Sequence, residues 1–470
     1  MFNKSIYTLL IGIITLIICL NFVNCRKQNI LTNSSAMLSF SEDTILFDTI
    51  FTTIGSTTKY YKIYNNNNGP INISSINLAN GTDSQFRINV NGDAGVQFEN
   101  IELETGDSMF IFIEVTIDPN NTSSPLIVED SILFLTNNNV QKTVLNAWGQ
   151  DAYFHVNEVL TQDETWNNDK PHVIYNYCAV DENNTLTIPE GTTIHGHPNS
   201  ILYIYKSSLQ VNGTLNNPVI FQQDRMEDFL LYSSDSTSGQ WRGIWFFQPL
   251  ESNINYTEIK NATIGIQVDT LESGNNVNLN SISVHNSLYA NILTQGGNIN
   301  ATNCLFGNSS QHSAFISIGG NVDFQQCTFG NYWQGQRNSA LMVFKDYYES
   351  NSIEFRPFNS ASFTNCIFHG SNSNELFIDT LGRNHPSGAT PVFNFTNCLV
   401  KSEDSINNSS FFINCFNNHE PLFNDPINWN FSIPNNSFVV DKGTTSSIMI
   451  DIIGNPRTGT FNDLGCYEAQ

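Results

Sequence analysis

Apolar and polar residues alternate along residues 38–152 in short runs that turn-forming residues separate. In INISSINLA (71–79) and SMFIFIEVTID (108–118), the apolar residues recur at about every second position. A period of two predicts strands that bury one face and expose the other. About seven such strands fit this stretch, which is typical of a two-sheet β-sandwich. No cysteine lies between Cys25 and Cys178, so the sandwich core must form without a disulfide.

A different pattern follows, in which short segments echo one another. TNCLFGN, QQCTFGN, TNCIFHG and TNCLVKS each place a cysteine at the third position. Successive cysteines in this set are separated by 23, 39 and 32 residues: Cys304, Cys327, Cys366 and Cys398. Echoes at about 20–25 residues, lengthened by insertions, indicate a solenoid. We predict a right-handed parallel β-helix over residues 153–440, because parallel crossovers almost always take that hand.

The repeated Asn-Cys-x-Phe motif predicts how the coils stack. The cysteine and the aromatic residue lie two positions apart, so both point to the same side of a strand. Stacked coils would then align the cysteines in one buried column beside a column of rings, at the inter-strand spacing of about 4.8 Å. The residue before each cysteine, which is asparagine in three segments and Gln326 in the other, would face the other way or mark a turn.

The first 25 residues have the pattern of a secretory signal. Lys4 precedes an apolar run from Ile6 to Leu20, which is short for a membrane-spanning helix. Cys25 follows this run and resembles the lipidated cysteine of a lipobox, although Asn24 stands where a small residue is usual. We therefore expect an exported protein anchored by a lipid on Cys25, with residues 26–37 as a polar tether.

The composition and charge of the chain limit the kinds of partner that it can bind. The chain has 43 acidic and 19 basic residues, a net charge of −24, and only 13% charged residues. Such a surface repels phosphate backbones, so we expect no nucleic-acid partner. It also disfavours a polyanionic sugar unless calcium or a local basic patch intervenes.

The segments FDTIFTTIGSTTKYYKIYN, FRINVNG and FIEVTIDP resemble immunoglobulin-like modules of the PapD and ASPM/SPD-2/hydin group. The stretches at 184–225 and 238–246 resemble the opening coils of pectin-lyase-like β-helix lipoproteins of the Bacteroidetes type. The end, GNPRTGTFNDLGCYE, resembles the closing motif of secreted β-helix proteins, with Cys466 where alanine is usual. The resemblance implies a spacer module, a right-handed β-helix and a closing segment at 441–470. It names no substrate.

Seven cysteines follow the signal segment, and exported proteins can pair them as disulfides. The apolar surroundings of the repeated cysteines favour buried free thiols. No CxxC pair is present, so the sequence gives no zinc motif, and we expect no cofactor.

Many β-helices are polysaccharide lyases or hydrolases, so clusters of charged residues are candidate active sites. The strongest enzyme candidates lie in what we predict to be a long insertion: Arg337, Lys345, Asp346 and Glu349. A second charged cluster comprises Asp224, Arg225, Glu227 and Asp228. Each has a structural interpretation as well, such as a hydrogen bond to a turn.

Other side chains have weaker claims. His195 and His197 lie two apart and lack an evident third metal ligand, and Trp241 and Trp245 are expected to pack. If the sandwich were a carbohydrate-binding module, its aromatic candidates would be Tyr60, Tyr61 and Trp148, but strand aromatics more often belong to a core.

The sequence therefore predicts an all-β, lipid-anchored cell-envelope protein, with the outer membrane as the expected location. We expect a non-enzymatic role in binding, adhesion or scaffolding towards a glycan or an envelope protein. The alternative is a polysaccharide lyase or glycoside hydrolase that works along the coils.

Overall fold

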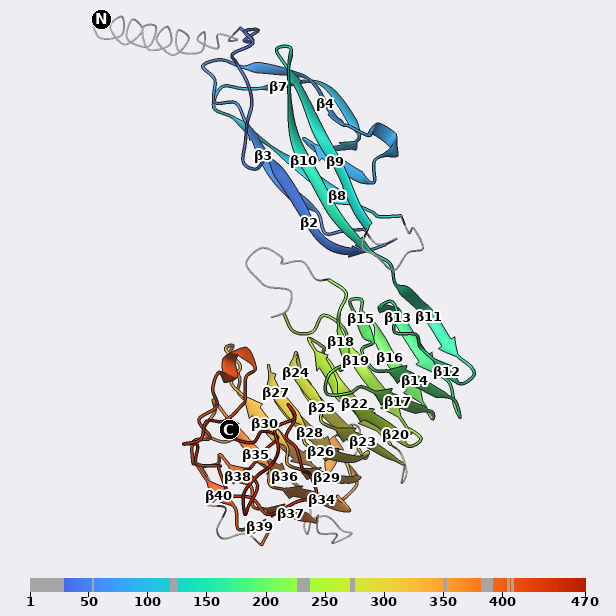
Figure 1. Ribbon diagram of the computed structural model, residues 1–470, viewed down its shortest axis with the longest axis vertical. Helices are drawn as coiled ribbons and strands as arrows, with labels where there is room; N and C mark the ends of the chain where they lie inside the picture. The colour runs from blue at the N-terminus through green and yellow to red at the C-terminus, as the bar shows by residue number, and fades with distance from the viewer. Residues whose placement is uncertain are drawn as a thin grey trace, which may run out of the picture. The chain divides into compact units, whose positions relative to one another are not determined.

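The computed structural model describes residues 29–52, 55–118, 126–225, 237–270, 275–349, 353–381, 392–403, 406 and 410–470. The signal segment with Cys25 lies outside the described residues, as do Glu227 and Asp228. The chain divides into two compact units, one ending at Gln150 and one beginning at Asp151 (Figure 1). In the described residues both units are built from β-strands, with short 3-10 turns at Gly81–Asp83 and Pro426–Asn428.

Across the described part of the chain, we find no helix with the length and apolar character needed to span a bilayer.

The first unit consists of two five-stranded sheets that enclose one core. The first sheet has the order β1 (Ser39–Phe40), β3 (Lys59–Tyr64), β8 (Ser108–Val115), β5 (Phe86–Val90), β6 (Asp93–Gly95). The second has the order β2 (Thr44–Phe51), β10 (Asn139–Gln150), β9 (Leu126–Thr136), β4 (Ile71–Leu78), β7 (Gln97–Leu103). Neighbouring strands are antiparallel except β10 and β2, which are parallel.

The alternation in the sequence produces this core directly. On β8, Ile111, Ile113 and Val115 are buried, whereas Phe110 and Phe112 face outward. The predicted pattern of strands with one buried face is therefore confirmed for this segment.

Within the segment predicted to be a polar tether, residues 26–37, the described residues 29–37 contact the sandwich. The backbone N–H of Leu31 donates to the Pro70 carbonyl at 2.7 Å, and Leu31 forms a bridge with Ile71. Ala36 is 5% exposed and belongs to the core. This part of the polar run therefore packs on the sandwich through Leu31 and Ala36.

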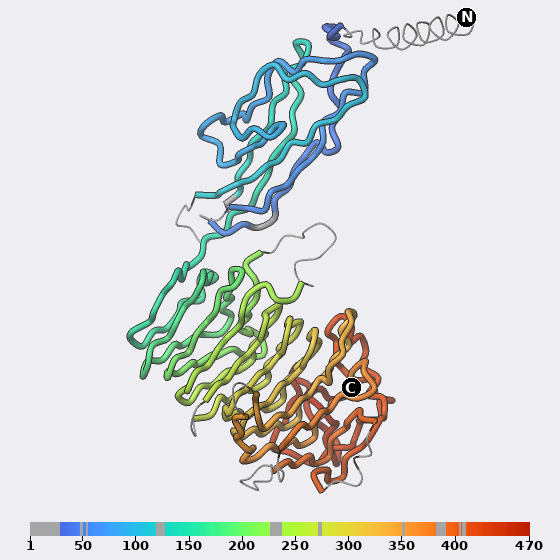
Figure 2. The backbone as a smooth tube through the Cα atoms, turned by 180° about the vertical axis from the view of Figure 1, so that it is seen from behind, coloured from blue at the N-terminus to red at the C-terminus, as the bar shows by residue number. Residues whose placement is uncertain are grey.

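The second unit is a stack of coils joined by parallel strands, the arrangement of a parallel β-helix (Figures 1 and 2). Its strands form three faces, which we call A, B and C. Face A consists of β15 (Thr193–Gly196), β18 (Val219–Gln223), β21 (Thr257–Lys260), β24 (Ser283–Ser287), β27 (Leu305–Ser309), β30 (Thr328–Asn331), β35 (Ile367–Gly370), β38 (Leu399–Val400) and β40 (Phe416–Asn417). Face B consists of β16 (Ile201–Tyr205), β19 (Gly243–Phe247), β22 (Ile264–Asp269), β25 (Ala290–Gln295), β28 (His312–Ser317), β31 (Met342–Lys345) and β36 (Leu376–Asp379).

Face C is the ten-stranded sheet of β12 (Glu164–Thr165), β14 (Thr185–Pro189), β17 (Ser208–Asn212), β20 (Ser252–Asn255), β23 (Asn276–Asn280), β26 (Asn298–Thr302), β29 (Asn321–Gln325), β34 (Ser360–Thr364), β37 (Phe393–Thr396) and β39 (Phe412–Ile413). The first coils use two long strands, β11 (Tyr153–Leu160) and β13 (His172–Val180), which run across both A and B. A hairpin of β32 (Tyr347–Glu349) and β33 (Ile353–Phe355) leaves the stack between β31 and β34.

The predicted cysteine column is confirmed. The backbone N–H groups of Thr328, Ile367 and Leu399 each donate to the carbonyl of the cysteine one coil earlier, at 2.9–3.0 Å. All four side chains of the column are fully buried: Cys304, Cys327, Cys366 and Cys398. The seven cysteines from Cys178 onward are free thiols, in agreement with the interpretation favoured from their apolar context.

The predicted ring column is present and is accompanied by a second one. Phe306, Phe329 and Phe368 stack on face A with ring centroids 5.0 Å apart. On face C the centroids of stacked neighbours are 4.8–5.1 Å apart, along the series Phe324, Phe363, Phe395 and Phe412. The residue before each cysteine forms the corner, with a positive φ of 60° at Asn303, 53° at Gln326, 55° at Asn365 and 49° at Asn397.

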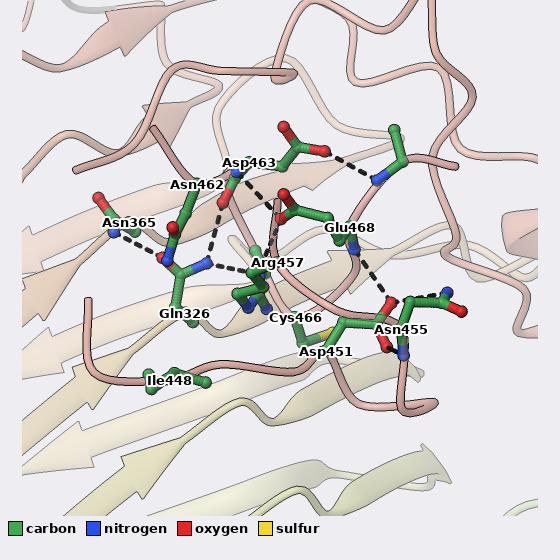
Figure 3. Close-up of polar contacts among 12 residues, drawn as sticks. Gln326, Asn365, Ile448, Asp451, Asn455, Arg457, Asn462, Asp463, Cys466 and Glu468 are labelled. Carbon is green, nitrogen blue, oxygen red and sulfur yellow. Dashed lines mark hydrogen bonds and ion pairs between the residues drawn. The ribbon is translucent and has the colours of Figure 1, made fainter. Parts of the chain in front are cut away.

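The chain after β40, residues 418–470, is called the C-terminal segment from here on. It lies along the outside of face A. Phe431 sits over Gly307 and Gly330, where a Cβ on Gly330 would come within 2.2 Å of the Phe431 ring. Figure 3 shows the polar contacts of this segment with the corner residues. The Gln326 amide donates to the carbonyl oxygens of Asp463 and Gly465 at 2.9 and 3.0 Å. Face A is therefore covered there by the chain itself.

Candidate functional site

A groove of about 700 Å³ lies on the outer side of face B. Its floor comes from adjacent strands, where Phe315 of β28, Val343 of β31 and Phe377 of β36 are register partners. Phe377 is 50% exposed, whereas Val343 is 7% exposed. Amide and hydroxyl side chains complete the walls: Asn338, Ser339, Asn372, Ser373 and Asn374. An apolar floor with polar walls is the usual composition of a small-molecule or sugar site.

One wall of the groove is held by a buried ion pair. The Arg337 guanidinium, in the loop between β30 and β31, binds both carboxylate oxygens of Glu375, and both side chains are almost fully buried. Glu375 also accepts hydrogen bonds from the backbone N–H groups of Leu341 and Asn372, at 3.0 and 2.9 Å. This pair fixes the two loops that carry the amide side chains.

The other end of the groove carries three interacting polar groups. Lys345 Nζ lies 3.9 Å from Asp379 Oδ2 and 4.3 Å from the centroid of the Tyr347 ring. The Tyr347 hydroxyl donates to Asp379 Oδ2 at 2.9 Å. This hydrogen bond to Asp379, which stabilises the protonated phenol, raises the pKa of Tyr347 above its ordinary value.

The four enzyme candidates therefore do not form one constellation. Arg337 and Lys345 both line the groove, but Asp346 is fully buried and its Oδ1 accepts from the Leu381 N–H at 2.8 Å. Glu349 is exposed on the hairpin strand β32 and does not line the groove. The prediction that Lys345 lies in an insertion is wrong, because Lys345 is the last residue of the coil strand β31.

The floor of the groove continues along face B as a ladder of outward side chains. Each member is the register partner of the next: Tyr203, Trp245, Gln267, Leu293, Phe315, Val343 and Phe377. Tyr203 and Trp245 have ring centroids 5.0 Å apart, and the Trp245 indole donates to Asp269 at 2.8 Å. Trp241, by contrast, is 1% exposed and packs in the core, as expected.

The two histidines predicted as weak metal candidates bind separate partners. His195 Nδ1 is 2.7 Å from the Gln223 carbonyl, and His197 Nδ1 is 2.6 Å from Asp224 Oδ2. Burial lowers the pKa of His195 to about 4. Among the described residues no third ligand joins this pair in a group able to hold a metal.

The sandwich also exposes aromatic side chains. Tyr60 is 51% exposed and its ring lies 5.5 Å from Phe110 and 6.0 Å from Phe112, whereas Tyr61 is buried. The expectation that the strand aromatics are core residues is therefore right for Tyr61 and wrong for Tyr60.

Sequence reasoning missed Phe315, Phe377, Glu375 and Asp379. No local pattern points to them. The sequence of a strand such as LFID (376–379) shows which side chains share a face, but not which strand pairs with it.

Comparison with known proteins identifies no family for this chain. No protein-family model matches the chain. No curated protein matches either. Among solved structures, a family 123 glycoside hydrolase from Clostridium perfringens is similar over 25% of this chain and 26% of its own, at 10% identity and a TM-score of 0.18.

The PapD-like domain 7 of human CEP192 is similar over 26% of this chain and 89% of that domain, at 10% identity and a TM-score of 0.17. The Vibrio cholerae VesB protease is similar over 25% of this chain and 33% of its own, at 12% identity and a TM-score of 0.17. At these TM-scores the likenesses assign neither a fold nor an activity to the chain.

Proposed function

We propose that this chain is an exported envelope protein, anchored by a lipid on Cys25, whose β-helix binds a neutral glycan in the face B groove without cleaving it. In this proposal the β-helix is right-handed, and the sandwich is an immunoglobulin-like spacer of the kind that precedes β-helices in Bacteroidetes-type lipoproteins. The outer membrane is its proposed location. The apolar run before Cys25 supports export.

The exposed aromatic floor is the observation that carries the binding proposal. The C–H face of a pyranose packs well on an aromatic ring, and Phe377 leaves half of its surface open for such contact. The amides of Asn338, Asn372 and Asn374 border the same space and can donate to and accept from sugar hydroxyls.

The electrostatics favour an uncharged ligand. Arg337 is neutralised by Glu375, and Lys345 faces Asp379, so the positive charges of the groove are paired. Burial lowers the pKa of His312, which lines the same groove, and so favours its neutral form. With a net charge of −24 on the whole chain, nothing in the groove favours a polyanion.

The same contacts argue against catalysis by the residues that the sequence singled out. Arg337 already donates from both terminal nitrogens to Glu375, so neither group is available as an acid or base. Hydrolysis needs two carboxyl groups flanking the scissile bond, and Asp379 is the one carboxylate among the described residues that line the groove.

One observation favours the second candidate, a lyase or hydrolase in the same groove. Lys345, Tyr347 and Asp379 place an amine, a phenol and a carboxylate within contact of one another. Such a trio supplies proton donors and acceptors, and a substrate bound on Phe377 would lie beside it.

A panel of neutral and acidic polysaccharides tests both candidates, with retention and cleavage scored on the same chain without its signal segment. We expect retention of a neutral polysaccharide, at least a tenfold loss with Phe377→Ala, and no cleavage. Phe461→Ala is the matched control, since Phe461 is 49% exposed and lies in the C-terminal segment. Retention that survives Phe377→Ala would overturn the proposed site. Cleavage lost in Lys345→Ala would establish the enzyme instead.

Anchoring is tested separately. We expect incorporation of a labelled fatty acid into the intact chain and its loss with Cys25→Ala. Cys19, which lies within the apolar run, is the control, and Cys19→Ala should keep the label. Label retained without Cys25 would refute the anchor while leaving the glycan site untouched.

A further inference from the structure

The first coil of the second unit contains a cluster of side chains outside the groove. His155 and Glu158 lie on β11, and Cys178 lies on the neighbouring strand β13. The pairing of these strands shifts register between Val156 and Glu158, which makes Glu158 the direct partner of Cys178. The irregularity in β11 thereby brings a carboxylate next to a thiol.

The three side chains present one potential ligand atom each to a common point. One atom from His155, Glu158 and Cys178 lies within 4.8 Å of each of the other two. Among the described residues this is the one such group of three histidine, cysteine or acidic side chains. In a tetrahedral zinc site, ligand atoms are about 3.5 Å apart for bonds of about 2.0–2.3 Å, so a modest closing movement suffices.

The hydrogen bonds around His155 determine which of its nitrogens is free. His172 Nε2 lies 2.7 Å from the Asn167 carbonyl oxygen, which can only accept, so this nitrogen carries a proton. His172 is 2% exposed, which disfavours a second proton, and its Nδ1 must then accept from His155 Nε2, at 2.8 Å.

His155 therefore carries its proton on Nε2 and directs the Nδ1 lone pair at a carboxylate oxygen of Glu158. Two acceptors in direct contact repel each other unless a cation lies between them. That cation is either a proton shared by the two side chains or a metal ion. Cys178 Sγ is a third potential ligand atom within 4.8 Å of the other two, which a metal ion can bind and a shared proton does not need.

The surroundings hold the His155 ring in a fixed orientation. The Trp166 indole stacks on His155 at 4.4 Å and on His172 at 4.3 Å, with interplanar angles of 16° and 8°. A histidine that binds a metal through one ring nitrogen usually donates a hydrogen bond from the other, which fixes the orientation of the ring.

We propose that His155 Nδ1, Glu158 Oε2 and Cys178 Sγ form a binding site for a divalent transition-metal ion of the zinc type. A donor set of one nitrogen, one oxygen and one sulfur suits Zn²⁺ and Co²⁺, whereas Ca²⁺ and Mg²⁺ prefer oxygen alone. The Glu158 side chain is 40% exposed, so the fourth position opens towards solvent. Binding displaces the Cys178 thiol proton to solvent and links β11 to β13 through the metal.

Titration of the metal-stripped chain, residues 26–470, with Co²⁺ tests the site. We expect one Co²⁺ per chain, with visible d–d bands and a near-ultraviolet thiolate-to-cobalt band, both displaced by Zn²⁺. Cys178→Ser should remove the thiolate band. Cys304→Ser is the matched control, because Cys304 is equally buried and lies in the cysteine column, and it should keep the band.

Glu158→Gln covers the case in which Cys178→Ser fails to fold, since Glu158 is part-exposed and the change is conservative. We expect it to weaken Co²⁺ binding by on the order of tenfold to a hundredfold. Zn²⁺ should raise the melting temperature of the unaltered chain more than that of Glu158→Gln at the same Zn²⁺ concentration. The absence of a thiolate band would overturn the site, and so would survival of that band in Cys178→Ser. A third contrary result would be ¹⁵N chemical shifts of the His155 ring that stay unchanged when Zn²⁺ is added.

Discussion

The two units use the same alternation of apolar and polar residues to build different kinds of core. In the sandwich, strands pair mostly antiparallel, some with the next strand in sequence and others, such as β2 and β10, across long separations. Its core is largely aliphatic, with residues such as Ile63, Ile111 and Ile132 fully buried. In the coil stack, each strand pairs in parallel with the equivalent strand one coil away. Like residues therefore lie over like, and cysteines and rings form columns. The sandwich core depends on all its strands at once, whereas each coil depends on its two neighbours.

The units also differ in their titratable groups. All nine histidines of the chain lie after Gln150. Burial lowers the pKa of His369 to about 3, as it lowers that of His195 to about 4. Protonation of histidine therefore acts on the coil stack alone.

The largest expected effect comes from removing a buried side chain. It should destabilise the coil stack locally and the sandwich as a whole. Phe363→Ala removes a ring from the middle of the face C column and should cost about 3–5 kcal/mol, and Ile113→Ala in the sandwich about 2–5 kcal/mol. Hydrogen exchange measured by mass spectrometry should rise near β29, β34 and β37 in the first variant, but throughout both sheets in the second. Phe377→Ala is the exposed control and should change stability by under about 0.5 kcal/mol. If the rise in hydrogen exchange extended equally far in both variants, the proposed difference between the two cores would be contradicted.

The next effect concerns the two ion pairs at the face B groove. Glu375→Ala leaves Arg337 buried without its partner and should destabilise the coil stack by about 3 kcal/mol in denaturant unfolding. Asp379→Ala removes the partner of the part-exposed Lys345 and should cost under about 1 kcal/mol. Similar losses in the two variants would mean that the Arg337–Glu375 pair does not hold the loops.

Acid should weaken the coil stack more than the sandwich. The folded-state pKa values of His195 and His369 lie below the unfolded value of 6.5, so the unfolded chain takes up protons first as the pH falls. The stability that the two neutral histidines contribute is fully present above about pH 6.5. It is lost as the pH falls towards their folded-state pKa values. Between pH 7 and 5.5 this amounts to about 1 kcal/mol for each histidine.

Unfolding at a series of pH values, followed by exchange in peptides from each unit, measures this difference. His195→Gln should reduce the pH dependence of the coil stack. A coil stack that is as stable at pH 5.5 as at pH 7 would show that these histidines do not govern its response.

The smallest effect is expected at a coil corner. Asn397 has a φ of 49°, and its side-chain Nδ2 makes no hydrogen bond, so its backbone conformation is the main feature at stake. Asn397→Ala should lower stability by about 1 kcal/mol, whereas Asn397→Gly, which accepts positive φ freely, should be nearly neutral. Thermal unfolding of the two variants side by side gives the difference, and a neutral alanine variant would refute the role of the corner.

Much of the fold could be predicted because its signals are local or repeated. The alternation on β8 and the four Asn-Cys-x-Phe-type segments gave the strands, the cysteine column and one ring column. The groove was only partly foreseen. Arg337 and Lys345 were named, but their partners Glu375 and Asp379 lie over 30 residues away on the next coil, and no motif links them. Insertions of irregular length conceal which residue lies above which.

The sequence alone determined the strand period, the repeated corners and the buried columns, because a period of two and an echoing motif allow one way to bury the apolar side chains. Only the tertiary structure decided the remaining features: the groove on face B, the segment that covers face A, and the meeting of His155, Glu158 and Cys178. Each depends on register between segments that are far apart in the chain, and register is set by packing of the whole coil stack rather than by any local pattern.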